Sequence, residues 1–197
     1  PLRAIASVTD PARRGIIVHG AIGDFLKTYP LVLPENAEHE LLRFGTIRFA
    51  PLRDDPASFS FWWPRFQRIA AWFADQEIAV RPLLRRSLAE VSGAIDLDIA
   101  GNRFTLTCRA DRIDITQGNT ARITDFKTGT VPSRKKVQTG LSPQLTLQAV
   151  ILARGGFPEI GAIEARSLIY VKLGGGDPPG EVIEDINADV MTLANSH

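Results

Sequence analysis

The order of apolar and polar residues divides the chain into a helix-rich first half and a strand-rich second half. In the first half, apolar residues recur every three or four positions, the period of a helix with one buried face. This period predicts helices over residues 14–28, 36–49 and 57–80. We expect Asn36 to cap the second helix, and Pro64 to lie in the first turn of the third, where a proline is tolerated.

The third predicted helix is unusually rich in aromatic side chains, and we expect most of them in the core. They are Phe59, Phe61, Trp62, Trp63, Phe66, Trp72 and Phe73.

In the second half, apolar and polar residues alternate, which is the period of a strand. Turn-forming residues at 100–102 and 117–119 separate the alternating segments, so we expect an antiparallel meander of three strands. These strands are expected over 88–99, 103–115 and 121–127, followed by a polar loop (128–140), a helix (142–154), a strand (166–173), a loop (174–180) and the start of a helix at 185–197. Ser142 is the expected cap of the helix over 142–154, with Pro143 as its first residue.

This order of elements predicts a mixed α/β (α+β) core with helical decoration. A length of 197 residues fits one domain. We expect a single domain over 1–197, with a helical part (1–82), a catalytic sheet core (83–173) and a C-terminal part (174–197). Because the chain starts without Met and stops within a predicted helix, we expect it to be a piece of a longer protein.

Composition narrows the possible functions by exclusion. No run of about 18 apolar residues is present, so we expect no membrane span and a cytoplasmic location. The single cysteine, Cys108, excludes an iron–sulfur cluster held by several cysteines of this chain alone. The net charge is only +1, so a basic binding surface requires local segregation of charge.

Two carboxylates and a lysine are predicted to share one face of the meander. Asp125 and Lys127 are two residues apart on a strand, so their side chains leave the same face. The turn between the second and third strands is centred near residue 118, which places Asp111 opposite Asp125. Residues opposite each other on paired strands have Cβ atoms about 4.5–5.5 Å apart.

Two carboxylates at this distance repel each other unless a positive charge lies between them. Lys127 supplies one positive charge, and Mg²⁺ or Mn²⁺, which prefer oxygen ligands, would supply more. Two acids, a lysine and a divalent cation suit metal-assisted hydrolysis of a phosphodiester. An ion pair between strands on a solvated surface is the alternative interpretation.

These residues resemble the motifs of the PD-(D/E)XK nuclease superfamily, in the RecB-like exonuclease branch. The resemblance extends over about residues 14–172 and includes five segments: Arg14–His19, Glu90–Gly93, Asp111, Asp125–Gly129 and Pro143–Leu145. Within that branch, the chain looks most like the C-terminal nuclease domains of AddB-type subunits of helicase–nucleases.

The resemblance implies a restriction-endonuclease-like core, with a central mixed sheet flanked by helices and a helical insertion, and a role for each matched residue. His19, Asp111, Asp125 and the Phe126 carbonyl would bind Mg²⁺ or Mn²⁺. Asp111, Asp125, Lys127 and Gln144 would be catalytic, with Gln144 positioning the DNA strand or the lysine. The family often has tyrosine four residues after the glutamine, where this chain has Gln148.

Several polar side chains are candidates for contact with nucleic acid. Three adjacent cations, Arg134, Lys135 and Lys136, follow the predicted catalytic strand, where they can contact phosphates or form a solvated loop. Arg109 shares the face of Asp111, so it can meet a phosphate or pair with an acid. Arg14 and Gln148 complete this group.

We therefore expect a Mg²⁺- or Mn²⁺-dependent deoxyribonuclease domain of a helicase–nuclease that processes double-strand break ends for recombinational repair. Its implied partners are a single DNA strand from an unwound duplex end, an AddA-type helicase–nuclease subunit and the rest of its own chain. One alternative is a catalytically silent nuclease-fold module that binds DNA or acts as a scaffold, but His19, both acids and Lys127 are all present. Another is a stand-alone RecB-like exonuclease or a CRISPR-associated nuclease.

Overall fold

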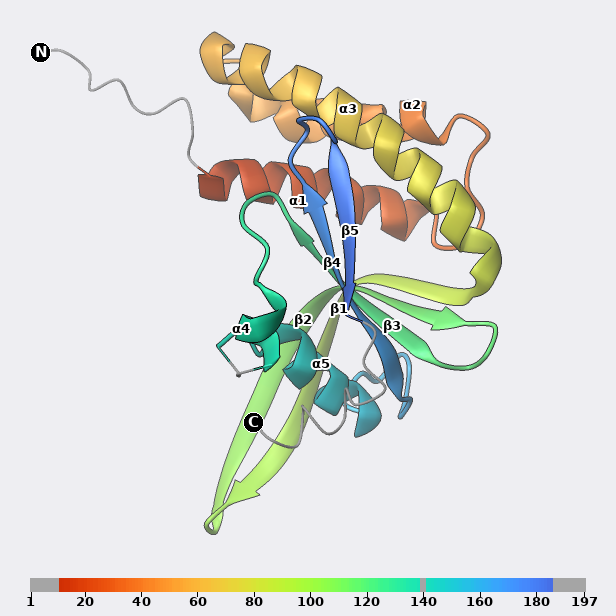
Figure 1. Cartoon of the computed structure of the whole chain (residues 1–197), viewed down its shortest axis with the longest axis vertical. Coiled ribbons are helices and arrows are strands. Elements are labelled where there is room, and N and C mark those ends of the chain that lie inside the picture. Colours follow the sequence, from red (N-terminus) through yellow and green to blue (C-terminus); the bar gives the residue numbers. More distant parts are fainter. Residues whose placement is uncertain (1–10, 139–140, 186–197) are drawn as a thin grey trace, which may run out of the picture. The chain divides into compact units, whose positions relative to one another are not determined.

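A computed structural model describes residues 11–138 and 141–185 of the chain (Figure 1). The chain divides into two compact units. Of the described residues, unit 1 contains 11–82, 126–130 and 172–181, and unit 2 contains 83–125, 131–138, 141–171 and 182–185.

Three helices form most of unit 1, close to the predicted positions. They are α1 (Pro11–Thr28), α2 (Ala37–Phe49) and α3 (Pro56–Val80), with short 3₁₀ turns η1 (Ala50–Leu52) and η2 (Arg81–Leu83) after α2 and α3. A Cβ atom at Gly45 of α2 would lie 2.0 Å from the Phe66 ring of α3, so the packing of these helices requires a glycine there. None of the helices in the described part of the chain is long and apolar enough to cross a membrane.

The start of α3 differs from the prediction. The helix begins at Pro56, and the Asp55 side chain caps it by accepting a hydrogen bond from the Ser58 amide. Pro64 therefore lies inside the helix and not in its first turn. Pro64 is exposed, so water can replace the backbone hydrogen bond that a proline removes. Asn36 stands at the cap position of α2 but makes no capping hydrogen bond with its side chain.

The aromatic residues of α3 are mostly not in the core. Only Phe66 and Phe73 are buried, whereas Phe61 is 38% exposed and the others are half-buried. The expectation that most of them lie in the core is therefore wrong.

Unit 2 is built on the predicted meander of strands. β1 (Leu84–Ile99), β2 (Asn102–Thr116) and β3 (Ala121–Lys127) pair in antiparallel order, and β4 (Ala165–Leu173) and β5 (Gly180–Asp185) complete one sheet in the order β1-β2-β3-β4-β5. The sequence pattern does not predict the strand β5. The helix expected over 185–197 begins at the last residue of β5, and its other residues, 186–197, lie outside the described residues. The mixed sheet flanked by helices confirms the predicted fold class.

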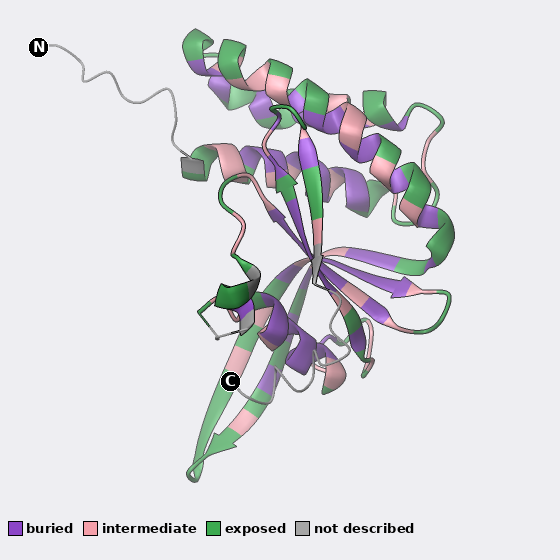
Figure 2. Ribbon diagram, viewed as in Figure 1, coloured by how far each residue is buried: buried purple, intermediate pink, exposed green. Residues whose placement is uncertain are grey.

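Two helices belong to unit 2. The segment expected to be a polar loop contains a short helix, α4 (Arg134–Gln138). The next helix, α5 (Gln144–Ala153), begins after Pro143, which is its cap residue and not its first residue. Most of α5 is buried, because its side chains are apolar around nearly the whole helix (Figure 2). Leu145, Ala149 and Ile151 of α5 belong to one core cluster with Ile113 of β2 and Ile123 of β3.

Candidate active site

The register of β2 and β3 brings the two predicted carboxylates to facing positions. The ladder pairs Arg112 with Thr124 and Ile113 with Ile123. One step further in the same register, Asp111 lies opposite Asp125, as the position of the turn predicts. Side chains alternate between the two faces of a strand, so Asp111 lies on the same face as Ile113, and Asp125 on the same face as Ile123. Ile113 and Ile123 belong to one core cluster with residues of α5.

Asp125 is held by a glutamine from α5. Its carboxylate is only 2% exposed, and Oδ1 accepts a hydrogen bond of 2.6 Å from Gln144 Nε2. Gln144 is the first residue of α5, so the start of this helix fixes its position. Asp111 is half-buried. A buried carboxylate held by an amide is positioned in advance for ligand binding, as a catalytic or metal-binding acid must be.

A third acidic residue, Glu90 of β1, stands at the register position opposite Asp111. β1 pairs Ala89 with Arg112 and Val91 with Ala110, which leaves Glu90 opposite Asp111. Glu90 has a left-handed backbone, with φ of 56°, and forms an ion pair with Arg109. The sequence motif includes Glu90, but no sequence pattern indicates its backbone conformation.

Gln148 lies one helical turn after Gln144 and has a different partner. Its side chain is 2% exposed, and Nε2 donates a 3.1 Å hydrogen bond to the Arg109 carbonyl. Its Oε1 is buried and has no hydrogen-bond partner among the described residues. The structure thus ties Gln148 to β2 and does not expose it to a nucleic acid. The Arg109 side chain forms an ion pair with Glu90 and is still 60% exposed.

The end of β3 belongs to unit 1 and packs there against α1 and α3. The Phe126 ring is 3% exposed and meets the His19 ring edge to face, with centroids 6.3 Å apart, and the Phe73 ring at 5.8 Å. Lys127 follows, half-buried and on the strand face of Asp125. The backbone of β3 thus presents Asp125 and Lys127 on one side and buries Phe126 on the other.

Arg14 of α1 contacts the residue after Lys127. Its Nη2 donates a 2.7 Å hydrogen bond to the Thr128 carbonyl, and its guanidinium lies 4.6 Å from the centre of the Trp62 ring. Burial lowers the pKa of Arg14 below its ordinary value. Arg14 is half-buried with these internal partners, and its contact with nucleic acid stays a prediction.

The remaining predicted cations lie on α4. Lys135 and Lys136 are exposed, and the backbone of Arg134 forms the start of this helix. Cys108 on β2 packs against the core cluster, and burial raises the pKa of its thiol. The thiol is therefore mainly protonated at neutral pH, which agrees with a packing role.

The donors present suit a hard divalent cation. Among residues 11–138 and 141–185, no three His, Cys, Asp or Glu side chains are grouped closely enough to hold a metal ion. The facing pair of Asp111 and Asp125 is nevertheless a set that Mg²⁺ accepts, because Mg²⁺ commonly binds one or two carboxylates and completes its shell with water and substrate phosphate. Two facing carboxylates also need a positive charge to offset their repulsion.

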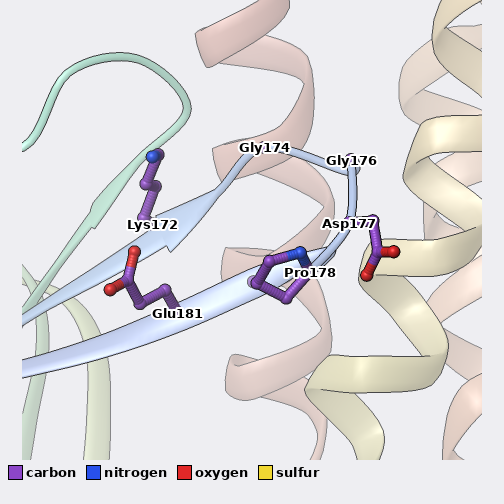
Figure 3. Close-up of a pocket in the computed structure, with 7 residues that line it drawn as sticks. Lys172, Gly174, Gly176, Asp177, Pro178 and Glu181 are labelled. Carbon is purple, nitrogen blue, oxygen red and sulfur yellow. The ribbon is translucent and has the colours of Figure 1, made fainter.

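A shallow pocket lies elsewhere, in the loop between β4 and β5 (Figure 3). It is lined by Lys172, Gly174, Gly176, Asp177, Pro178, Gly180 and Glu181. None of the predicted site residues lines it.

Comparison with known proteins gives a family match over almost the whole chain. A family model described as the PD-(D/E)XK nuclease superfamily matches residues 2–192. A solved structure titled "Crystal structure of SSO0001" matches with a TM-score of 0.39 and 14% identity, covering 92% of this chain and 81% of that one.

The curated relatives are uncharacterized proteins of Rickettsia. One from Rickettsia bellii is 27% identical over 91% of this chain, and one from Rickettsia typhi is 41% identical over 34% of it. The match spans 23% of the length of the first relative and 8% of the second.

Proposed function

We propose, on the premise that this chain belongs to the PD-(D/E)XK nuclease superfamily, that it is a Mg²⁺- or Mn²⁺-dependent deoxyribonuclease domain. One observation carries the proposal: the strand register sets Asp111 opposite Asp125, and Gln144 holds Asp125 at 2.6 Å. Lys127 follows on the same face of β3. A family member that had lost catalysis would have less reason to keep this set intact.

Each residue of this set has a proposed task. Asp111, Asp125 and the Phe126 carbonyl would supply oxygen ligands to the metal, and His19 would supply an imidazole ligand, as the family resemblance implies. When bound, the metal would activate water and take up charge on the phosphodiester. Gln144 keeps the Asp125 carboxylate in one orientation through its amide hydrogen bond.

Lys127 is proposed to act on the reacting groups themselves. Its ammonium is a donor that can orient the attacking water or stabilise charge that develops on the phosphate. The burial of Phe126 beside it fixes the backbone from which the lysine side chain extends.

At the finer level, we propose that the domain serves a helicase–nuclease of the AddB type. It would cut a single strand from an unwound duplex end during double-strand break repair, beside an AddA-type subunit. The sequence resemblance supports this assignment, as does the match to only 23% of a longer relative. A stand-alone RecB-like exonuclease is the competing assignment.

The first test is a calorimetric titration of Mn²⁺ into the purified chain and into Asp125→Ala. We expect the wild-type chain to bind and the variant not to bind. In parallel, cleavage of a fluorescent single-stranded oligonucleotide should fall by at least about 100-fold in Asp111→Asn, Asp125→Asn and Lys127→Met. Asp98→Asn, which removes an exposed carboxylate at the far end of β1, is the matched control and should cleave normally.

The outcomes separate the candidate functions. Binding of Mn²⁺ by wild type but not by Asp125→Ala, together with cleavage, supports the nuclease. Wild-type cleavage by Asp125→Asn would overturn the assignment of that residue. DNA binding with no cleavage under any metal would favour the silent DNA-binding module.

A further inference from the structure

An aromatic and cationic patch lies on α3, within unit 1. It consists of Phe61, Trp62 and Arg65, and we call it the α3 platform. The Arg65 guanidinium lies 3.6 Å from the centre of the Phe61 ring and 5.6 Å from that of Trp62. The Phe61 and Trp62 rings meet edge to face, with centroids 4.9 Å apart.

Internal contacts hold the platform in shape. Arg65 Nη1 donates a 2.8 Å hydrogen bond to the Phe61 carbonyl one turn earlier, which keeps the guanidinium over the ring. Phe61 is 38% exposed, so part of this fixed arrangement is open to a ligand. The neighbouring Arg68 is excluded from the platform because its Nε donates a 2.9 Å hydrogen bond to the Gly175 carbonyl.

The platform lies in a stretch of α3 that contains no acidic residue. Residues 56–74 of α3 contain two arginines and no aspartate or glutamate. The chain as a whole has nearly equal numbers of acids and bases. Asp75 and Glu77 follow later in α3, so the positive charge is confined to the part of the helix around the platform. There Arg65 provides a local cation, of the kind that a chain with a net charge of +1 needs to bind nucleic acid.

A short series of contacts links the platform to the catalytic strand within unit 1. The Trp62 ring lies 4.6 Å from the Arg14 guanidinium, and Arg14 Nη2 donates to the Thr128 carbonyl at 2.7 Å. Thr128 directly follows Lys127. A ligand lying on the platform is thus only a few side chains from the end of β3.

We propose that the α3 platform binds unpaired bases of a single nucleic-acid strand, next to the segment that is cut. Unpaired bases stack on aromatic rings and on guanidinium planes, with little dependence on sequence. A paired duplex hides these base faces, so the platform selects single strands. The binding itself stands on the contacts above, and only its link to cleavage rests on the proposed nuclease function.

The test compares two fluorescein-labelled strands of equal charge by anisotropy, with the full chain in EDTA so that no metal-dependent cleavage occurs. One strand is dT15 and the other is the same backbone with its bases removed. We expect the wild-type chain to bind dT15 at least tenfold more tightly, a difference of about 1.4 kcal/mol, because only dT15 has bases that can stack on the platform. An rU15 strand should bind similarly, because stacking needs no particular sugar.

Two substitutions address the platform, and one serves as a control. Phe61→Ala and Arg65→Gln should each remove most of the preference for the strand with bases. Phe61→Leu keeps an apolar side chain and separates loss of stacking from loss of packing. Arg43→Gln is the matched control, because Arg43 also lies over a phenylalanine ring, that of Phe44 at 4.4 Å, but on α2. It should retain the preference.

Circular dichroism first checks that Phe61→Ala, Phe61→Leu and Arg65→Gln are folded. The proposal is overturned if these folded variants prefer dT15 over the base-free strand as strongly as wild type does. Equal wild-type affinity for the two strands would overturn it as well. Asp125→Asn separates this proposal from the nuclease: it should bind dT15 like wild type and fail to cleave. If the wild-type chain proves inactive but prefers bases, the nuclease fails and the platform stands.

Discussion

Glu90 has a left-handed backbone in the interior of β1, with φ of 56°. This conformation costs a residue with a Cβ atom roughly 1–2 kcal/mol, and it costs glycine almost nothing. Such strain is commonly retained where function requires a side chain. Glu90 stands opposite Asp111 in the strand register, so the strain occurs in the row of candidate acids.

Glycine should therefore be better tolerated than alanine at position 90. Both Glu90→Gly and Glu90→Ala remove the carboxylate and its pairing with Arg109, so the pair isolates the backbone effect. Glycine normally costs about 0.5–1 kcal/mol relative to alanine inside a strand. We expect the reverse order here, with the glycine variant about 1 kcal/mol more stable in urea denaturation. A more stable alanine variant would show that residue 90 is not left-handed in solution.

The sequence pattern could predict which positions of neighbouring strands face each other in the candidate site. The turn near residue 118 fixed the opposition of Asp111 and Asp125, because register follows directly from the centre of a short turn. The burial of Gln148, the internal partners of Arg14 and the exposure of Phe61 could not be predicted. Each depends on which distant segment packs against the side chain, and spacing along the chain does not contain that information.

At the scale of elements, α3 depends on its first turn. The Asp55 carboxylate accepts hydrogen bonds from the Ser58 hydroxyl at 2.6 Å and from the Ser58 amide at 3.2 Å. The hydroxyl bond, followed by the amide bond, lowers the pKa of Asp55 below its ordinary 3.8. A carboxyl group with a lowered pKa in the folded state stabilises that state above pH 3.8, and the stabilisation is lost as the pH falls through the lowered value.

Asp55→Ala should accordingly lower the melting temperature at pH 7, because the first turn of α3 loses its cap. The difference from wild type should shrink as the pH falls below 3.8. Melting curves by circular dichroism between pH 7 and pH 2.5 measure this, with Asp75→Ala, an exposed acid later in α3, as the control. A difference that stays constant with pH would contradict the role of the charged carboxylate.

The long elements were predictable, and the short ones were not. Eighteen residues of α1 and sixteen of β1 repeat their pattern several times, so their periods are clear. The helix α4 has five residues and β5 has six, too few to establish a period. The predicted start of α3 at residue 57 is one residue late, and the proline in its first turn is Pro56 and not Pro64, with Asp55 as the cap.

At the scale of the whole molecule, the two units are interleaved along the chain. Residues 126–130 and 172–181 come from the strand-rich half and yet belong to unit 1, beyond the helical part expected over 1–82. Lys127 is therefore in one unit and Asp125 in the other, although they are two residues apart on one strand. Periodicity identifies elements, but it does not say to which core a short connecting segment returns.

The effect of the net charge on nucleic-acid binding can be separated by experiment from the effect of where the cations lie. With a net charge of +1, the chain has little overall attraction for a polyanion, so affinity must come from cations at particular places. Each phosphate contact with a single strand contributes about 0.7 to the slope of log affinity against log salt. Replacing Arg134, Lys135 and Lys136 of α4 by glutamine should therefore weaken binding of dT15 and flatten that slope by about 2.

The control removes the same total charge elsewhere. Lys27, Arg53 and Arg154 are exposed and are spread over both units, and changing all three to glutamine also lowers the net charge by three. If the α4 cations contact phosphates directly, the control variant keeps the wild-type slope of log affinity against log salt, whereas the slope of the α4 variant is flatter by about 2. Equal slopes for the two variants would mean that only total charge matters and that α4 does not contact the strand. Anisotropy titrations of dT15 between 25 and 200 mM salt distinguish these results, because total charge is identical in the two variants and only its position differs.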